Sequence, residues 1–131
     1  MLKAPSPTAE LLDAVQCYFQ LMYDCDVLKF DDVFHPSAAL TGLRDDAINE
    51  WSAAHYRDVL SKRESPKSLG ADRHEEVLLV DFASPNQALV KVRVLINKTI
   101  FVDYLTYLKT GDGWRVAFKA YHVEKATAEG G

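Results

Sequence analysis

The sequence predicts an α+β fold, in which three N-terminal helices pack on one side of a curled, mostly antiparallel β-sheet. Apolar residues recur at helical spacing up to about residue 60, and after residue 73 they follow the alternation of a strand. The residues Thr110-Gly-Asp-Gly113 are typical of a hairpin turn. Helices that precede the strands, instead of alternating with them, are expected to cover one side of an antiparallel sheet.

The first helix is predicted over about residues 7–24. Ser6 is a suitable N-cap and Pro7 suits the first helical position. One face of this helix is apolar at the expected spacing, with Leu11, Val15, Tyr18 and Met22.

Two further helices are predicted before residue 63. Asp26 can cap a short second helix, which should end at His35-Pro36 because proline disfavours helix at the preceding residue. A third helix is expected to begin at Asn49 and to carry Trp51 and His55. Residues 38–43 are short enough for a strand, and residues 63–70 are rich in turn formers.

Four longer strands are predicted at about 73–83, 87–97, 99–109 and 114–124. Alternation divides the last of them into two faces. One face should carry Trp114, Val116, Phe118, Ala120 and His122, and the other Arg115, Lys119 and Tyr121. The chain is expected to form one domain over residues 1–131, with an ordered core over about 7–125 and an unstructured tail.

Composition narrows the possible functions. Fifteen basic and nineteen acidic side chains give a net charge of -4, without a Lys/Arg cluster, so we expect no nucleic-acid partner. No apolar run approaches the ~20 residues of a membrane span, so we expect no membrane partner. The first residues lack the apolar core of a signal peptide, and we therefore expect a cytoplasmic protein.

The sequence gives no reason to expect a metal or a cofactor. If Cys17 and Cys25 share a helix, they lie roughly 12 Å apart, too far for a disulfide. Neither cysteine has the neighbours of a zinc site. The Asp45-Asp46 pair is expected in a loop, without the further carboxylates that a cation site needs.

Asp103 is the most informative residue, because it interrupts an apolar strand. Alternation places it on the same face as Phe101, Leu105 and Tyr107. A carboxylate in such surroundings must be paired, hydrogen-bonded or protonated. Since Arg93 and Lys119 alternate onto the other faces of their strands, we expect no cation beside Asp103.

The opposite face of the same strand is also apolar. The predicted helices can cover only one face of the sheet, so we expect the other to meet a second subunit in a homodimer. The residues of this face are Ile100, Val102, Tyr104 and Leu108.

Several short segments of the sequence, within about residues 10–124, resemble segments of one superfamily. They are Val33-Phe-His-Pro-Ser-Ala-Ala-Leu40, Phe101-Val-Asp-Tyr-Leu105 and Gly111-Asp-Gly-Trp-Arg-Val116, together with Trp51 and Arg63-Glu-Ser-Pro66. This pattern is similar to the nuclear transport factor 2-like superfamily, which includes the ketosteroid isomerases, and most to its "putative lumazine-binding" group. The resemblance implies a cone-shaped, cystatin-like roll with a small-molecule pocket.

Ketosteroid isomerases bind the substrate oxyanion through a helix-1 tyrosine and a protonated strand aspartic acid. The resemblance places Tyr18 and Asp103 at these two positions and His122 where the isomerases carry a pocket aromatic. Their catalytic base corresponds to Gly42, which has no side chain to accept a proton. Steroid isomerisation is therefore not implied.

The candidate site combines these residues. Tyr18, Asp103 and His122 are the candidate catalytic residues, and the candidate ligand-binding residues are Met22, Trp51, His55, Tyr107 and Phe118. Each has a structural alternative. Asp103 can instead accept a buried bond from Tyr18, His122 or Arg93, Trp51 can be a core residue, and His55 can face solvent.

Three functions remain open. The first is a binding protein that holds an apolar or planar ligand in the cone between helices and sheet, with Asp103 and Tyr18 as polar anchors. The second is a cofactor-independent isomerase, cyclase or dehydratase in which His122 is the base. The third is a dimerisation module that has no ligand.

Overall fold

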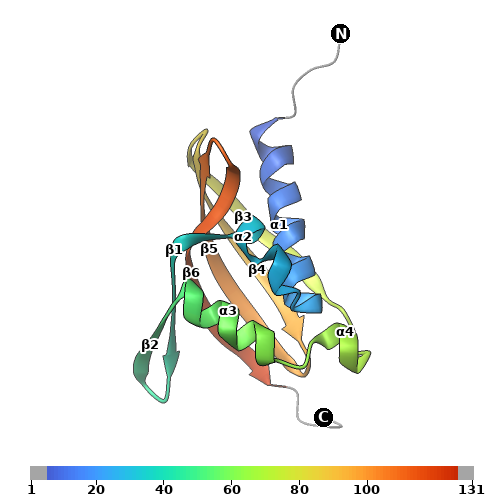
Figure 1. The fold of residues 1–131 in the computed structure, drawn as a ribbon. Coiled ribbons are helices and arrows are strands. Elements are labelled where there is room, and N and C mark those ends of the chain that lie inside the picture. Colours follow the sequence, from blue (N-terminus) through green and yellow to red (C-terminus); the bar gives the residue numbers. More distant parts are fainter. Residues whose placement is uncertain (1–5, 127–131) are drawn as a thin grey trace.

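The computed structural model describes residues 6–126. Helices cover one face of a single six-stranded sheet (Figure 1). The helices are α1 (Pro7–Asp24), the 3-10 helix η1 (Val27–Lys29), α2 (Phe30–Val33), α3 (Ala53–Lys62) and α4 (Pro66–Leu69). The strands are β1 (Phe34–Arg44), β2 (Ala47–Ser52), β3 (Glu75–Ser84), β4 (Gln87–Ile96), β5 (Thr99–Thr110) and β6 (Gly113–Ala126). The predicted α+β class, with helices on a curved and mostly antiparallel sheet, is confirmed.

The sheet has the order β2-β1-β6-β5-β4-β3. Neighbouring strands are antiparallel, except that β1 pairs with β6 in parallel. The long β3–β6 meander forms the body of the sheet, and the β1–β2 hairpin extends it to one side (Figure 1). Ala126 belongs to β6, while the rest of the expected unstructured tail lies outside the described residues.

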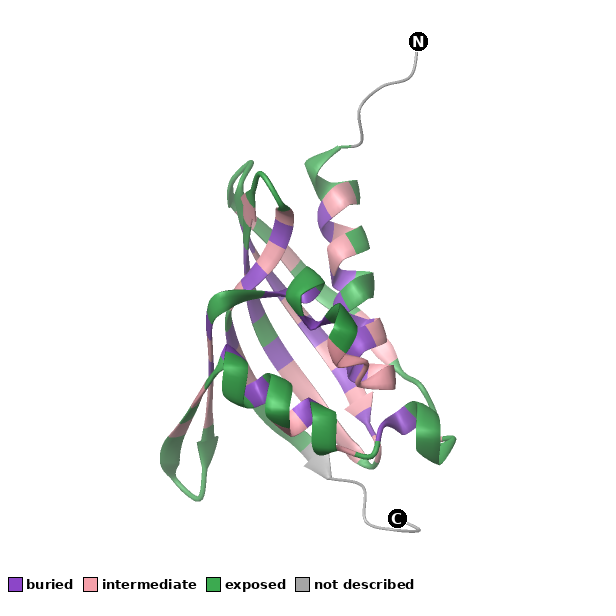
Figure 2. Ribbon diagram, viewed as in Figure 1, coloured by how far each residue is buried: buried purple, intermediate pink, exposed green. Residues whose placement is uncertain are grey.

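The prediction for α1 is confirmed at both ends. Ser6 accepts a hydrogen bond from the backbone N–H of Ala9 at 3.1 Å, and Pro7 follows at the first helical position. The helix ends at Cys25, whose left-handed backbone (φ 53°) lets its N–H donate to the carbonyl of Leu21. The apolar stripe of α1 is buried against the sheet, as the purple segments of Figure 2 show.

The prediction for the third helix was wrong at its start. Asp45 and Asp46 both have positive φ, at 52° and 65°, and they join β1 to β2 in a two-residue turn. Asn49 and Trp51 therefore lie in β2, and α3 begins only after Ser52, whose side chain caps it. The expected loop at 63–70 contains the short helix α4.

The pairing of β6 with β5 is interrupted by two β-bulges, at Ala117 and at Glu124, and the first of them affects the site. Thr106 of β5 pairs with Phe118, but the next residue, Tyr107, pairs with Val116. Ala117 is thus an extra residue in β6. Because side chains alternate between faces, this extra residue moves the side chains from Phe118 to Val123 to the face opposite to that expected from unbroken alternation.

The bulge makes the predicted faces of β6 wrong beyond Val116. Lys119 is buried on the helix side, whereas Phe118 remains 40% exposed and His122 is exposed. His122 lies with Val102 and Tyr104 in a hollow on the side of the sheet away from the helices. We call this side the outer face.

Most of the core lies between α1, α2, α3 and the helix-facing side of the sheet. The outer face is less covered, and on β5 Tyr104 is 47% and Leu108 39% exposed. Within residues 6–126, every helix is too short or too polar to cross a membrane.

Candidate functional site

Tyr18 and Asp103 meet in the core, as predicted. The Tyr18 hydroxyl donates to Asp103 Oδ2 at 2.5 Å, and both residues are almost completely buried. The bond joins the apolar stripe of α1 to the centre of β5. Burial, and then the charge of Asp103, raise the pKa of Tyr18 well above its usual value, so Tyr18 keeps its proton and acts as the donor.

Lys119 is the third member of this group. Its Nζ lies 3.7 Å from Asp103 Oδ2 and 5.2 Å from the centre of the Tyr18 ring, and the residue is 5% exposed. The expectation that no cation lies beside Asp103 was wrong, because the bulge at Ala117 turns Lys119 inward. The group is therefore a buried ion pair with a tyrosine donor.

Lys119 also lines a pocket between α3, the β1–β2 hairpin and the helix-facing side of the sheet. Its volume is about 90 Å³. We call it the cone pocket. Its aromatic walls are Trp51, Tyr56, Phe101 and Tyr121, and its cations are Arg44, Arg63 and Lys119.

Arg63 follows the last residue of α3 and lies beside the Cys25 thiol. Burial raises the pKa of that thiol, while the charge of Arg63 acts in the opposite direction. The guanidinium carbon of Arg63 is 6.0 Å from the centre of the Tyr56 ring. Its Nη1 is buried without a hydrogen-bond partner among residues 6–126.

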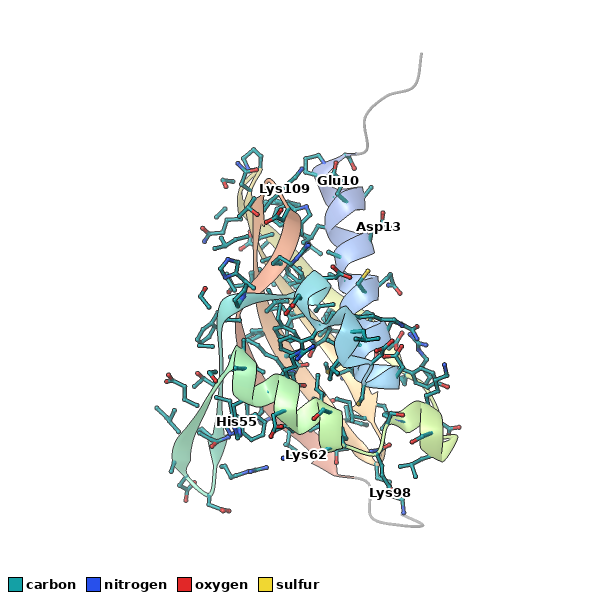
Figure 3. All side chains as sticks on the ribbon, in the orientation of Figure 1. Glu10, Asp13, His55, Lys62, Lys98 and Lys109 are labelled. Atoms are coloured by element: carbon teal, nitrogen blue, oxygen red, sulfur yellow. The ribbon has the colours of Figure 1, made fainter. Side chains whose placement is uncertain are left out.

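Of the predicted ligand-binding residues, Trp51 lines the cone pocket. His55 lies beside it, with ring centres 5.1 Å apart, but is exposed on the side of α3 toward β2 (Figure 3). Met22 and Tyr107 are fully buried in the core and do not line the pocket. Tyr18 and Asp103 are likewise behind its wall.

Phe118 and His122 do not belong to this pocket. Both were expected on the face of Asp103, and the bulge places them on the outer face. The predicted wall that combined them with Tyr18 and Asp103 was therefore wrong. The sequence prediction did not include three residues that line the cone pocket, namely Tyr56, Arg63 and Lys119. Lys119 was missed because nothing in the alternation of β6 reveals the bulge.

Gly42 has a steric role. A Cβ at this position would overlap the ring of Tyr121, closer than real Cβ atoms approach other atoms. The Tyr121 hydroxyl accepts a hydrogen bond from Asn49 Nδ2 at 2.9 Å, which holds the ring over Gly42. The position that resembles the base of the isomerases is thus filled by an aromatic ring.

A larger hollow of about 590 Å³ lies on the outer face. Its Arg93 is paired with Glu124 at 2.8 Å and with Glu76 at 3.2 Å, whereas Arg44 and Arg63 of the cone pocket form no ion pair within residues 6–126. Among the described residues, no three His, Cys, Asp or Glu side chains cluster as metal ligands would.

Two ion pairs at the ends of α1 lie outside the pocket. Lys109, at the end of β5, binds Glu10 of α1 at 2.7 Å (Figure 3). Lys29 binds Asp24 at 2.7 Å, next to the end of α1. These pairs hold α1 in place, which positions Tyr18 over β5.

Solved structures share this fold at low sequence identity. A nuclear transport factor 2-like protein of unknown function from Shewanella baltica OS155 has a TM-score of 0.78 and 18% identity, covering 88% of this chain and 92% of its own. One from Silicibacter pomeroyi DSS-3 has a TM-score of 0.74 and 20% identity, covering 89% and 95%. A ketosteroid isomerase-like protein from Erwinia carotovora atroseptica has a TM-score of 0.68 and 13% identity, covering 89% and 95%.

Sequence comparison identifies the family more narrowly. No curated protein matches the chain in sequence. The sequence model of the family described as "Putative lumazine-binding" matches residues 6–122, nearly the whole of the described fold. The chain therefore belongs to the family described as "Putative lumazine-binding", and it shares the fold of the nuclear transport factor 2-like structures.

Proposed function

We propose that the protein binds a small planar molecule in the cone pocket. The observation that carries this proposal is the lining: four aromatic side chains from different elements surround a few convergent polar groups. Such a combination is typical of small-molecule sites. The name of the family supports the same class of ligand.

In this proposal Tyr18 and Asp103 act through Lys119. Both lie behind the pocket wall, so neither reaches a ligand directly. Asp103 pairs with the ammonium of Lys119, and Tyr18 fixes the carboxylate by its hydrogen bond. The predicted polar anchors thus position the cation that faces the ligand.

The arrangement favours binding over acid–base catalysis. The residues that line the cone pocket include no His, Asp or Glu, and a general base must come within hydrogen-bond reach of its proton. His122, the base expected from the sequence, is on the outer face. Gly42 has no side chain, and Tyr121 occupies the space beside it.

We also propose a homodimer through the outer face. Tyr104, Leu108 and Phe118 are each about two-fifths exposed or more on this side, and Val102 is half-buried beside them. Exposed apolar side chains grouped on one face of a β-sheet are typical of an interface between subunits.

The binding proposal is tested by titrating ¹⁵N-labelled protein with lumazine and a panel of one- and two-ring aromatic compounds. We expect chemical-shift changes at the Trp51 indole and the amides of Phe101 and Tyr121. Ile96→Phe should abolish them, because Ile96 lines the cone pocket. Ile48→Phe is the matched control, since Ile48 is exposed on the outer side of the β1–β2 hairpin. Shifts confined to the outer face, or no shifts, would contradict the proposal.

A further inference from the structure

We infer that the ligand of the cone pocket carries an anionic group, and that it is an aromatic carboxylate bound by Arg63 with support from Lys119. This inference rests on the proposed function and names the chemistry of its ligand.

The charge of the cone pocket is the first argument. Arg44, Arg63 and Lys119 line it, and no acidic residue does. Asp103, from behind the wall, balances only Lys119. The whole chain has a net charge of -4, so positive charge is concentrated in this pocket against the overall balance. Clefts lined by one sign of charge attract ligands of the opposite sign.

Arg63 is the second argument. Among residues 6–126 it forms no ion pair, and its buried Nη1 has no hydrogen-bond partner. A buried donor without a partner is unfavourable, and such groups are rare in folded proteins. The planar guanidinium matches a carboxylate with two parallel hydrogen bonds. Nη1 itself is closed off from solvent, while the rest of the half-buried side chain lines the cone pocket. A carboxylate in the pocket would bind the accessible edge of the guanidinium, and a rotation of the side chain would bring Nη1 to the same ligand.

Lys119 is placed to add its charge. Its contact with Asp103 is 3.7 Å, longer than a hydrogen bond, and its hydrogen bond to the Tyr56 hydroxyl is 3.4 Å. Lys119 Nζ lies 5.0 Å from the centre of the Tyr56 ring, and the guanidinium carbon of Arg63 lies 6.0 Å from the same centre. The two cations thus lie around one aromatic side chain of the pocket.

The size and walls of the pocket favour one ring. The pocket volume is about 90 Å³. A cavity of about 150 Å³ encloses one benzene molecule, so the pocket has room for no more than one ring, part of which must lie at its opening. Trp51 and Phe101 line the pocket and offer faces for the ring.

The test compares matched probes on the unaltered protein. Benzoate and benzamide have nearly the same shape, but only benzoate is charged. We expect benzoate to bind at least tenfold more tightly than benzamide in NMR titrations at low ionic strength. Equal affinities would overturn the inference and leave the proposed function standing. Binding of neither probe, with binding of another compound of the panel, would also overturn the inference. Failure of the whole panel would refute both the inference and the proposed function.

The variant Arg63→Gln tests whether Arg63 is the residue that binds the carboxylate. It should weaken benzoate binding by about tenfold to a hundredfold and leave benzamide unchanged. Arg57→Gln is the matched control, because Arg57 lies on the neighbouring helix α3 and the same unit of charge is lost outside the pocket. Equal losses in both variants would assign the effect to net charge and overturn the role of Arg63. Circular dichroism shows whether each variant folds. The comparison of benzoate with benzamide uses the unaltered protein and does not depend on either variant.

Discussion

Asp103→Asn tests the buried group most directly, because it removes one charge and nearly preserves the shape. The substituted side chain can still accept the hydrogen bond of Tyr18 through its amide oxygen. Lys119, however, would remain 5% exposed with no carboxylate beside it. We therefore expect Asp103→Asn to destabilise the protein at pH 7.

The expected loss follows from the geometry. Removing one partner of a fully buried ion pair costs about 3–5 kcal/mol. Retention of the Tyr18 bond saves about 1 kcal/mol of this. The Lys119–Asp103 distance of 3.7 Å also makes the pair weaker than a close one. The free energy of unfolding should fall by about 2–3 kcal/mol, which leaves a folded protein if the starting value is typical.

Urea denaturation followed by circular dichroism measures this change. For a chain of this size the midpoint should fall by roughly 1–2 M. The double variant Asp103→Asn with Lys119→Met should be less destabilised than the sum of the single variants, because the second change removes the unpaired charge. An unchanged midpoint for Asp103→Asn would refute the buried pair and indicate a neutral acid.

Three further predictions concern other parts of the molecule. Val102→Asp should weaken the proposed homodimer strongly, because it places a carboxylate on the outer face. Sedimentation equilibrium at micromolar concentration measures this, and a wild-type monomer of 14.7 kDa would exclude the dimer. Burial by itself would raise the pKa of Asp24. Hydrogen bonds from Lys29, the backbone N–H of Asp26 and Gln20 have the larger effect together, and they lower this pKa. Asp24→Asn should therefore cost about 1 kcal/mol at pH 7. In urea titrations the difference should persist above the ordinary pKa of 3.8 and disappear as the pH falls below it, and a constant difference would exclude the ion pair. Gly42→Ala should displace Tyr121 and destabilise the protein by about 1–3 kcal/mol, and a crystal structure with Tyr121 unmoved would show that the neighbouring strands adapt instead.

The sequence was most informative where local chemistry determines the structure. The bounds of α1 could be predicted because Ser6, Pro7 and the apolar stripe all indicate the same helix. The meeting of Tyr18 with Asp103 followed from the resemblance, since a tyrosine and an acid occupy matching elements in the isomerases. Trp51 was placed on the wrong element, because its spacing to His55 suits a helix and Asp45-Asp46 is a less recognisable turn than Asn-Gly.

The cations of the site could not be predicted, for a different reason. Whether Lys119 faces the core depends on the pairing of Thr106 and Tyr107 with β6, and that pairing is a property of two strands together. Arg63 lies at the start of the turn-rich segment expected after the third helix, and no spacing in that segment indicates that its side chain packs against Tyr56. Period-2 alternation within a single strand contains neither piece of information.

Ala117 has a consequence for how this pocket can change. Deletion of this one residue would join Val116 directly to Phe118, whose partners Tyr107 and Thr106 are already adjacent in β5. Lys119 would therefore keep facing the helices, and His122 the outer face. A one-residue slip of β6 that paired Ala117 with Thr106 would instead turn Lys119 outward and bring His122 toward the helices. The register between β5 and β6, more than the presence of any one side chain, thus decides whether the pocket presents an ammonium or an imidazole.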